Sequence, residues 1–365
     1  MDPIDVVLLP AGLALLAGGG ELLVRGASRL AAALGISPLV IGLTVVAYGT
    51  SAPEAAVTLQ SGLEGRADLA LGNVVGSSIF NVLVVLGISA LIVPLVVSQR
   101  LVRIEVPLLV GVSGLVLLLG LDGDIGRGDG ALLVAGAIAY TFFAVRRSRR
   151  EESAVADQYA REYGPPRRPV RLVTGHLALV VLGLGLLVLG SRWLVDGAVA
   201  VARSLGMSEL VIGLTIVAVG TSLPEVATSL VAALRHERDI AVGNIVGSNL
   251  FNLLAALGLG GLLVPGGIHV APAALRFDLP VMLAVAVACL PIFFTGHLIA
   301  RWEGGLFLAY YAAYTAYLIM AAAGHDALPA FSRVMAAFVI PLTFLTLAVL
   351  AARAWREQRR TAPGE

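Results

Sequence analysis

The chain has 365 residues, of which 58 % are hydrophobic and 13 % are charged, with a formal net charge of +1. Its mean hydropathy of +0.92 is well above that of soluble globular domains and indicates an integral membrane protein. All 25 basic residues are Arg, which excludes a Walker A lysine and a Schiff-base lysine. The near-neutral charge and the single Cys give no indication of a nucleic-acid partner or of a disulfide framework.

Apolar runs of about 20 residues are long enough to cross the hydrocarbon core of a bilayer. The sequence contains eleven such runs, at 5–24, 38–60, 69–93, 104–121, 130–146, 173–193, 209–233, 240–264, 277–296, 303–322 and 331–352. The first run follows the start MDPIDVVLLP, which has no basic segment. We therefore expect this span to be retained rather than cleaved as a signal peptide.

The distribution of Arg predicts the orientation of these spans. The one substantial connection between spans runs from Arg146 to Arg171 and contains eight Arg. If this link is cytoplasmic, 19 of the 25 Arg lie on the cytoplasmic side, in agreement with the positive-inside rule. With an odd number of spans, the N-terminus is then outside and the C-terminus cytoplasmic. We expect a multi-pass protein of the cell's inner (plasma) membrane.

Two stretches of the chain are repeats of one another. Residues Gly42–Gly87 and Gly213–Gly258 align without a gap at an offset of 171 residues and are identical at 25 of 46 positions. They lie five spans apart, so the second copy enters the membrane in the opposite direction. Inverted repeats of this kind are typical of secondary transporters, whose substrate site lies near the membrane midplane between the repeats.

The predicted fold is an all-α integral membrane protein with two inverted five-helix repeats, broken helices 2 and 7, and an eleventh C-terminal helix. The predicted regions are a first repeat at 1–146, an Arg-rich cytoplasmic link at 147–172, a second repeat at 173–322, an extra transmembrane helix at 331–352 and a cytoplasmic tail at 353–365.

Each repeat contains a GTSxPE core, which places one carboxylate in apolar sequence: Glu54 in the first and Glu225 in the second. An ionisable residue at membrane depth is expensive and indicates a functional site. Pro53 and its equivalent Pro224 should break the helix and free backbone carbonyls. The helical spacing of three or four residues places hydroxyls of GTS on the same face as the carboxylate.

A second repeated core, GNxVGSxxFN, adds a hydroxyl and an amide four residues apart, as Ser77 with Asn81 and Ser248 with Asn252. Carboxylates, hydroxyls, amides and carbonyls are ligands for hard cations such as Ca²⁺ or Na⁺, and these cores contain neither His nor Cys. A structural interpretation exists for the small residues, since Ser, Thr and small-xxx-small glycines also mediate packing between membrane helices.

The paired GTSxPE and GNxVGSxxFN motifs resemble the alpha-repeats of the sodium/calcium exchanger family in its prokaryotic form. The resemblance implies exchange of Na⁺ for Ca²⁺ by alternating access, with no cofactor and no enzymatic activity, and we expect the protein to extrude Ca²⁺. It implies that Glu54 and Glu225 bind both ions and that the carbonyls of Thr50 and Thr221 assist with Ca²⁺. The Na⁺ ligands that it implies are Ser51, Ser77 and the Ala47 carbonyl in one site, and Ser222, Ser248 and the Ala218 carbonyl in another.

One position departs from the family pattern, because relatives carry Asp where this chain has Asn252. The site then has Asn81 and Asn252 in equivalent places and lacks a third carboxylate. Exchange of Ca²⁺ (or another divalent cation) for H⁺ is therefore an alternative, although protons need only the carboxylates and not the four serines. A cation channel with a ring of carboxylates fits the broken inverted repeats less well, and an intramembrane hydrolase would need nucleophile–base pairs or metal-binding His that these cores lack. The sequence does not indicate an oligomeric state.

Overall fold

A computed structural model describes residues 3–163, 170–205, 218–294, 297–346, 348, 349 and 352 of the chain, which are almost entirely helical. The first half comprises α1 (Pro3–Leu34), α2 (Pro38–Ile41), η1 (Gly42–Val46), α3 (Ala47–Thr50), α4 (Ala52–Leu63), α5 (Ala67–Phe80), η2 (Asn81–Leu86), α6 (Gly87–Ile92), β1 (Leu95–Val96), η3 (Leu101–Glu105), α7 (Val106–Leu119), η4 (Gly120–Asp122), β2 (Asp124–Ile125) and α8 (Arg127–Tyr163).

The second half comprises α9 (Val170–Ser204), α11 (Ala218–Gly220), α12 (Leu223–Leu234), α13 (Arg238–Phe251), η6 (Asn252–Ala256), α14 (Leu257–Leu263), β3 (Ile268–His269), η7 (Ala274–Asp278), α15 (Leu279–Phe294), β4 (Leu298–Ile299), α16 (Arg301–Ala322), α17 (Leu328–Val334) and η8 (Met335–Val339). The η segments are π-helical, except that η4 is a 3₁₀ turn, and most of them continue a neighbouring α-helix.

Ten of the eleven predicted spans are recognisable in the described part of the chain, although a few residues of 277–296 and 331–352 lie outside it. Nine are helices long and apolar enough to cross a membrane, and the tenth is the bent pair 38–50 and 52–63. The predicted span 209–233 is described only from Ala218, as α11 and α12. Residues 213–217 of the second motif, 164–169 of the link and the whole predicted tail, 353–365, lie outside the described residues. Much of the predicted link is helical, because α8 continues to Tyr163.

The predicted break in helix 2 is present between α3 and α4, whose axes differ by 45°. It lies at Ser51, with φ −89° and ψ 6°, two residues before Pro53. The second repeat has the same geometry at Ser222, with φ −92° and ψ 6°. Because proline has no backbone N–H, each break removes the donor for the carbonyl four residues earlier.

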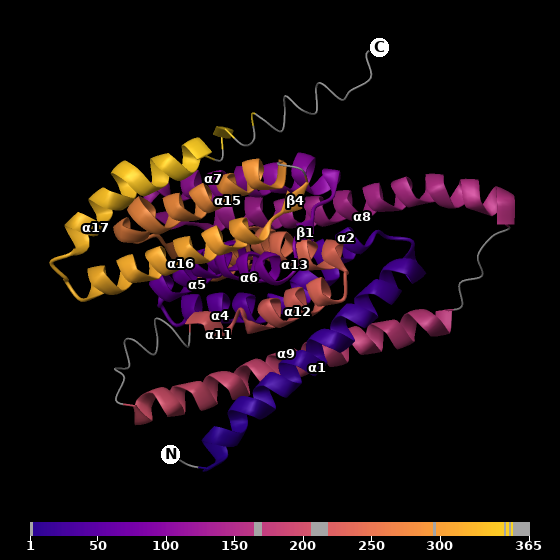
Figure 1. Ribbon diagram of the computed structural model, residues 1–365, viewed down its shortest axis with the longest axis horizontal. Helices are drawn as coiled ribbons and strands as arrows, with labels where there is room; N and C mark the ends of the chain where they lie inside the picture. Colours follow the sequence, from indigo (N-terminus) through magenta and orange to yellow (C-terminus); the bar gives the residue numbers. More distant parts are fainter. Residues whose placement is uncertain are drawn as a thin grey trace.

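Helices α1 and α9 form a pair that packs along one side of the bundle and crosses there (Figure 1). Glycines let their backbones touch. A Cβ atom on Gly12 would lie 2.8 Å from the carbonyl oxygen of Gly190, and one on Gly19 would lie 2.9 Å from that of Gly183. A side chain at these positions would separate the two helices, so the close contact requires glycine.

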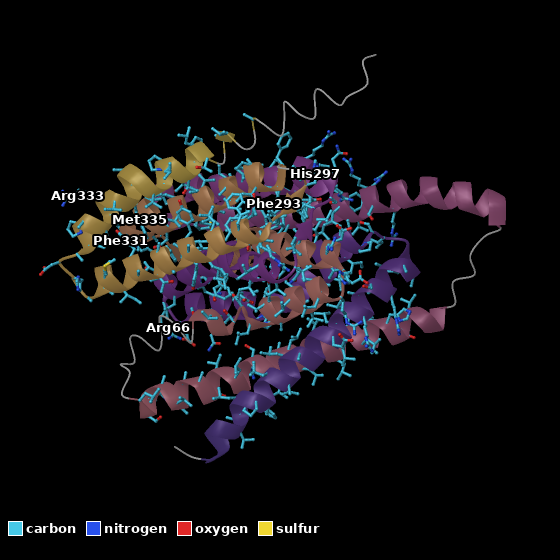
Figure 2. The ribbon with its side chains drawn as sticks, viewed as in Figure 1. Arg66, Phe293, His297, Phe331, Arg333 and Met335 are labelled. Carbon is cyan, nitrogen blue, oxygen red and sulfur yellow. The ribbon has the colours of Figure 1, made fainter. Side chains whose placement is uncertain are left out.

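Two short strand pairs join loops from opposite halves of the chain. β1 pairs antiparallel with β4, and β2 pairs antiparallel with β3. Paired loops must lie on the same membrane side, and the predicted eleven-span topology places them so. In Figure 2, Arg66 and Arg333, both predicted to be outside, lie toward the left end, whereas the extended end of α8 lies at the right.

Candidate ion-binding site

Two fully buried carboxylates lie where the halves of the molecule meet. Glu54 and Glu225 each occupy the first turn of the helix that follows a break, α4 or α12, and neither has any exposed surface. Each accepts a hydrogen bond from the opposite repeat. Ser51 Oγ donates to Glu225 Oε1 at 2.7 Å, and Ser222 Oγ donates to Glu54 Oε1 at 3.2 Å. The two breaks are therefore joined by a reciprocal pair of bonds.

The second oxygen of each carboxylate, Oε2, is buried and has no hydrogen-bond partner among the described residues. Two other carboxylates of the described chain are also buried, but both are satisfied. Glu105 accepts from the Tyr140 hydroxyl at 2.8 Å and pairs with Arg100 at 3.3 Å, and Glu303 accepts the backbone N–H of Ala300. A buried charge without a partner is costly. The Oε2 atoms of Glu54 and Glu225 are thus buried carboxylate oxygens that could bind a cation.

The remaining predicted serines lie beside these carboxylates. Ser248 Oγ donates to Glu225 Oε1 at 3.4 Å, and Ser222 Oγ lies 3.3 Å from Ser77 Oγ. A hydroxyl has one proton and two acceptor lone pairs, so donating to a carboxylate leaves its oxygen able to bind a cation. The four buried serines can therefore act as ligands without giving up these bonds.

The two predicted asparagines each begin a π segment, η2 or η6, which is a common feature of functional sites. Both are fully buried. Asn81 Nδ2 donates to Asn249 Oδ1 at 3.1 Å, and Asn81 Oδ1 has no partner among the described residues. Asn252 lacks a partner there on both side-chain atoms. The residue equivalent to Asn249 is Ser78, whose hydroxyl donates to the Val74 carbonyl of its own helix. Asn252 therefore has no counterpart of the bond that Asn81 makes.

The predicted backbone ligands are less available in this conformation. The Ala47 carbonyl accepts the Ser51 N–H at 3.0 Å and the Thr50 hydroxyl at 3.3 Å. It is therefore already paired, whereas the sequence predicted freed carbonyls at this break. Proline frees the carbonyl of Gly49 rather than that of Ala47, because Pro53 is four residues after Gly49. Ala218 begins α11, and Thr221 lies in the turn that follows it.

Two asparagines that brace the breaks were missed by the sequence analysis. Asn73 Nδ2 donates to the Glu54 carbonyl oxygen and to Thr58 Oγ1, both at 2.9 Å. Its equivalent Asn244 accepts the Thr50 hydroxyl at 3.1 Å. The signal was present, because Asn73, Ser77 and Asn81 are spaced by four residues along one helix face, and the same spacing recurs in the second repeat.

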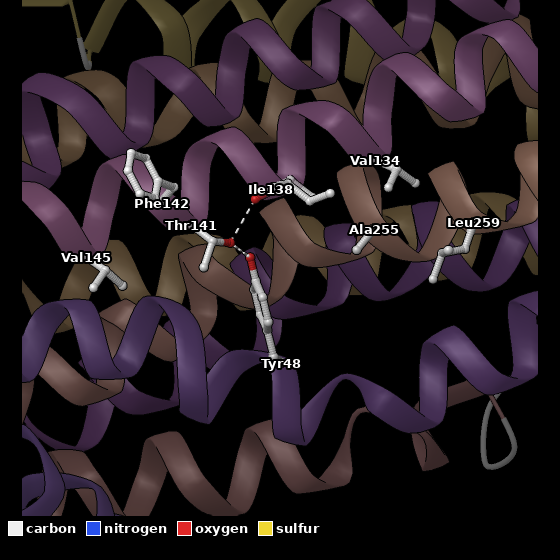
Figure 3. A pocket seen from close by; sticks show the side chains of 9 residues that line it. Tyr48, Val134, Ile138, Thr141, Phe142, Val145, Ala255 and Leu259 are labelled. Atoms are coloured by element: carbon white, nitrogen blue, oxygen red, sulfur yellow. Dashed lines mark hydrogen bonds between the residues drawn. The ribbon is translucent and has the colours of Figure 1, made fainter.

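A cavity of about 580 Å³, lined by residues of α3, α8, η6 and α14, is chemically different from this site (Figure 3). Its lining is apolar apart from Tyr48 and Thr141, which are hydrogen-bonded to each other. Figure 3 shows Tyr48 pointing from the broken helix toward α8, where Thr141 also donates to the Ala137 carbonyl. A hard cation needs several oxygen ligands, which this lining does not offer.

Comparison with known proteins agrees with the geometry. The sequence pattern of the family described as "Sodium/calcium exchanger protein" matches residues 4–146 and 175–320. CaxA of Alkalimonas amylolytica is 41 % identical over 289 residues, which cover 79 % of this chain and 89 % of CaxA. The inner membrane protein YrbG of Escherichia coli is 40 % identical over 285 residues, which cover 77 % and 86 % of the two chains.

Among solved structures, the sodium-calcium exchanger NCX_Mj matches with a TM-score of 0.75 and 31 % identity, covering 87 % of this chain and 100 % of NCX_Mj. The family pattern spans both repeats, and the structural match includes their inverted arrangement. The chain is therefore a multi-pass membrane protein that belongs to the sodium/calcium exchanger family of antiporters.

Proposed function

We propose that this protein exchanges Ca²⁺ for Na⁺ by alternating access and extrudes Ca²⁺ from the cell. The observation that carries the proposal is the pair of buried carboxylates, Glu54 and Glu225, each with one oxygen that has no hydrogen-bond partner among the described residues. Two carboxylates cancel the charge of one Ca²⁺, so an occupied site is close to neutral in a medium of low dielectric constant. The described chain contains no ion pair to either of them.

The same carboxylates serve both ions, which makes Na⁺ and Ca²⁺ compete for one site. An empty site would carry two desolvated negative charges through the membrane, which is unfavourable. Crossing is favourable only with a cation bound, and this requirement produces exchange rather than leakage. The carbonyls of Thr50 and Thr221 complete the Ca²⁺ site. Asn81 and Asn252 lie beside it as neutral oxygen donors.

Two Na⁺ sites flank the carboxylates. Ser51, Ser77 and the Ala47 carbonyl form one, and Ser222, Ser248 and the Ala218 carbonyl form the other. For Na⁺ to bind in the first, the Ala47 carbonyl must release at least one of its two donors, Ser51 N–H or the Thr50 hydroxyl. The four buried hydroxyls favour Na⁺ over H⁺ as the coupling ion, because protonation of the carboxylates requires no further oxygen ligands.

The Arg distribution gives the orientation: with the Arg-rich link in the cytoplasm, the N-terminus is outside. An inward Na⁺ gradient then gives the direction, in which Na⁺ enters as Ca²⁺ leaves. The relative YrbG is named as an inner membrane protein, and we place this chain in the same membrane.

Flux into everted membrane vesicles tests the proposal. An outwardly directed Na⁺ gradient, with the proton gradient collapsed, should drive uptake of radioactive Ca²⁺. Uptake driven by a proton gradient and unaffected by Na⁺ would instead show H⁺/Ca²⁺ exchange, and a steady single-channel current would show a channel. The Glu54→Gln variant serves as the inactive control.

A further inference from the structure

The carbonyl of Gly220, at the break before α12, receives a hydrogen bond from a different helix. In a continuous helix this carbonyl would accept the backbone N–H of residue 224, but Pro224 has none. The hydroxyl of Ser191, on α9, donates to the Gly220 carbonyl oxygen. Ser191 is buried, with 7 % of its surface exposed. The donor that proline removes is therefore replaced by a neighbouring helix.

The first repeat cannot make this bond, because one residue differs. The position equivalent to Ser191 in α1 is Gly20, which has no hydroxyl, although Pro53 removes the donor for Gly49 in the same way. Gly20 lies against α12 instead, where a Cβ atom would come within 3.2 Å of the carbonyl oxygen of Ala227. The α1–α9 pair thus donates a hydrogen bond to the break of the second repeat, but Gly20 offers no such donor to the break of the first.

Ser191 also lies next to a contact between α9 and α1. Its neighbour Gly190 touches α1, since a Cβ atom on Gly190 would lie 2.9 Å from the carbonyl oxygen of Gly12. The Ser191 bond therefore connects the break to α9. At the adjacent residue, Gly190, α9 contacts the backbone of α1.

We propose that Ser191 is a positioning residue of the ion site. Its bond to Gly220 holds the break in the conformation that aims the second residue after Gly220, Ser222, at Glu54, to which Ser222 Oγ donates at 3.2 Å. The inference rests on the proposed function, because the ion affected is the Na⁺ assigned to Ser222. Na⁺ binding in the second repeat then depends on a hydrogen bond from the α1–α9 pair, for which Gly20 offers no donor in the first repeat.

The test is the Na⁺ concentration that releases half of the bound Ca²⁺ from purified protein. Ser191→Ala should raise this concentration by about 2- to 10-fold, as expected for the loss of one buried hydrogen bond. Ser191→Thr keeps the hydroxyl and should restore the normal value. Ser204→Ala is the matched control on the same helix, because the Ser204 hydroxyl donates only to its own turn at Val201.

A double-mutant cycle with Pro224→Ala tests the origin of the effect. Alanine returns an N–H to position 224, so the Gly220 carbonyl regains a helical donor and no longer needs Ser191. The shift in thermal midpoint caused by Ser191→Ala should then be smaller in the Pro224→Ala background. If Ser191→Ala alone fails to insert, Pro224→Ala should restore insertion.

The outcomes separate this inference from the proposed function. Release of no Ca²⁺ by Na⁺ in the unmodified protein rejects Na⁺/Ca²⁺ exchange, while the thermal cycle still reports on the Ser191 bond. Normal release in the unmodified protein together with an unchanged Ser191→Ala variant overturns the role of Ser191. Equal impairment by Ala and Thr, strictly additive midpoint shifts, or continued failure to insert in the double variant would overturn it as well.

Discussion

Ser51→Ala removes the donor that stabilises the ionised form of Glu225 and, on the proposed function, one oxygen of a Na⁺ site. The Ser51–Glu225 bond is 2.7 Å long, in the usual range for a hydroxyl and a carboxylate. A hydrogen bond to a charged group contributes about 1.5–3 kcal/mol, and about 1.4 kcal/mol corresponds to a tenfold change in affinity. We therefore expect Na⁺ affinity to fall by roughly 10- to 100-fold.

The equivalent change in the other repeat should have a smaller effect. The Ser222–Glu54 bond is longer, at 3.2 Å, and its single proton is shared with Ser77. Ser222→Ala should lower Na⁺ affinity by about 3- to 10-fold, as for a weaker, neutral-type bond. Calcium affinity should fall less in both variants, because the ligands assigned to Ca²⁺ do not include these serines.

Calorimetric titration of the purified protein with Na⁺ and with Ca²⁺ separately measures both affinities. Ser78→Ala is the matched control, because Ser78 is a buried serine of the same region whose hydroxyl donates to its own helix at Val74. Equal losses for the two ions would refute the separation of Na⁺ and Ca²⁺ ligands. A larger loss in Ser222→Ala than in Ser51→Ala would refute the reasoning from bond geometry.

Three further predictions concern charge, topology and the departure from the family pattern. Glu54→Gln or Glu225→Gln should abolish Ca²⁺ flux in vesicles, because one charge cannot offset a desolvated divalent ion, and near-normal flux in either variant would contradict the site. In a background without the native cysteine, a cysteine at Arg66 should react with an impermeant maleimide from outside and one at Arg238 only from the cytoplasm; labelling from one side would contradict the inversion. Asn252→Asp should keep exchange and add a protonation step to the pH profile of flux, because a third carboxylate then lies near two others. An unchanged profile would count against the placement of Asn252 near Glu54 and Glu225.

Much of the fold could be predicted because its determinants are local. Apolar runs mark where helices cross the bilayer, and the offset of 171 residues between the repeats predicts the inversion without any contact being known. The lengths of α1 and α9 were underestimated, at 5–24 and 173–193, because these helices continue through less apolar flanks to Leu34 and Ser204. Hydropathy detects the membrane-crossing part of a helix and not its ends.

The partners within the site could not be predicted, because they depend on how the two halves dock. Helical spacing places Ser51 on the same face as Glu54, but its hydroxyl donates to Glu225 of the other repeat. The unequal surroundings of Asn81 and Asn252 follow from one substitution, Asn249 in place of Ser78, whose effect appears only across the interface. The sequence identifies which side chains meet, and the docking of the repeats decides which atoms bond.

The structure is less symmetric than its sequence, and the asymmetry concerns the α1–α9 pair. Glu21 of α1 forms an ion pair with Arg235 at the end of α12, whereas the residue equivalent to Arg235, Glu64 at the end of α4, pairs with Arg66. The residue of α9 equivalent to Glu21 is Arg192, so acid and base are exchanged between the two positions and attraction is preserved. An inverted-repeat transporter has a second conformation in which its halves exchange roles. In that conformation Arg192 would face Glu64 at the opposite membrane side. The exchanged charges would then allow the same attraction at either end of the bundle.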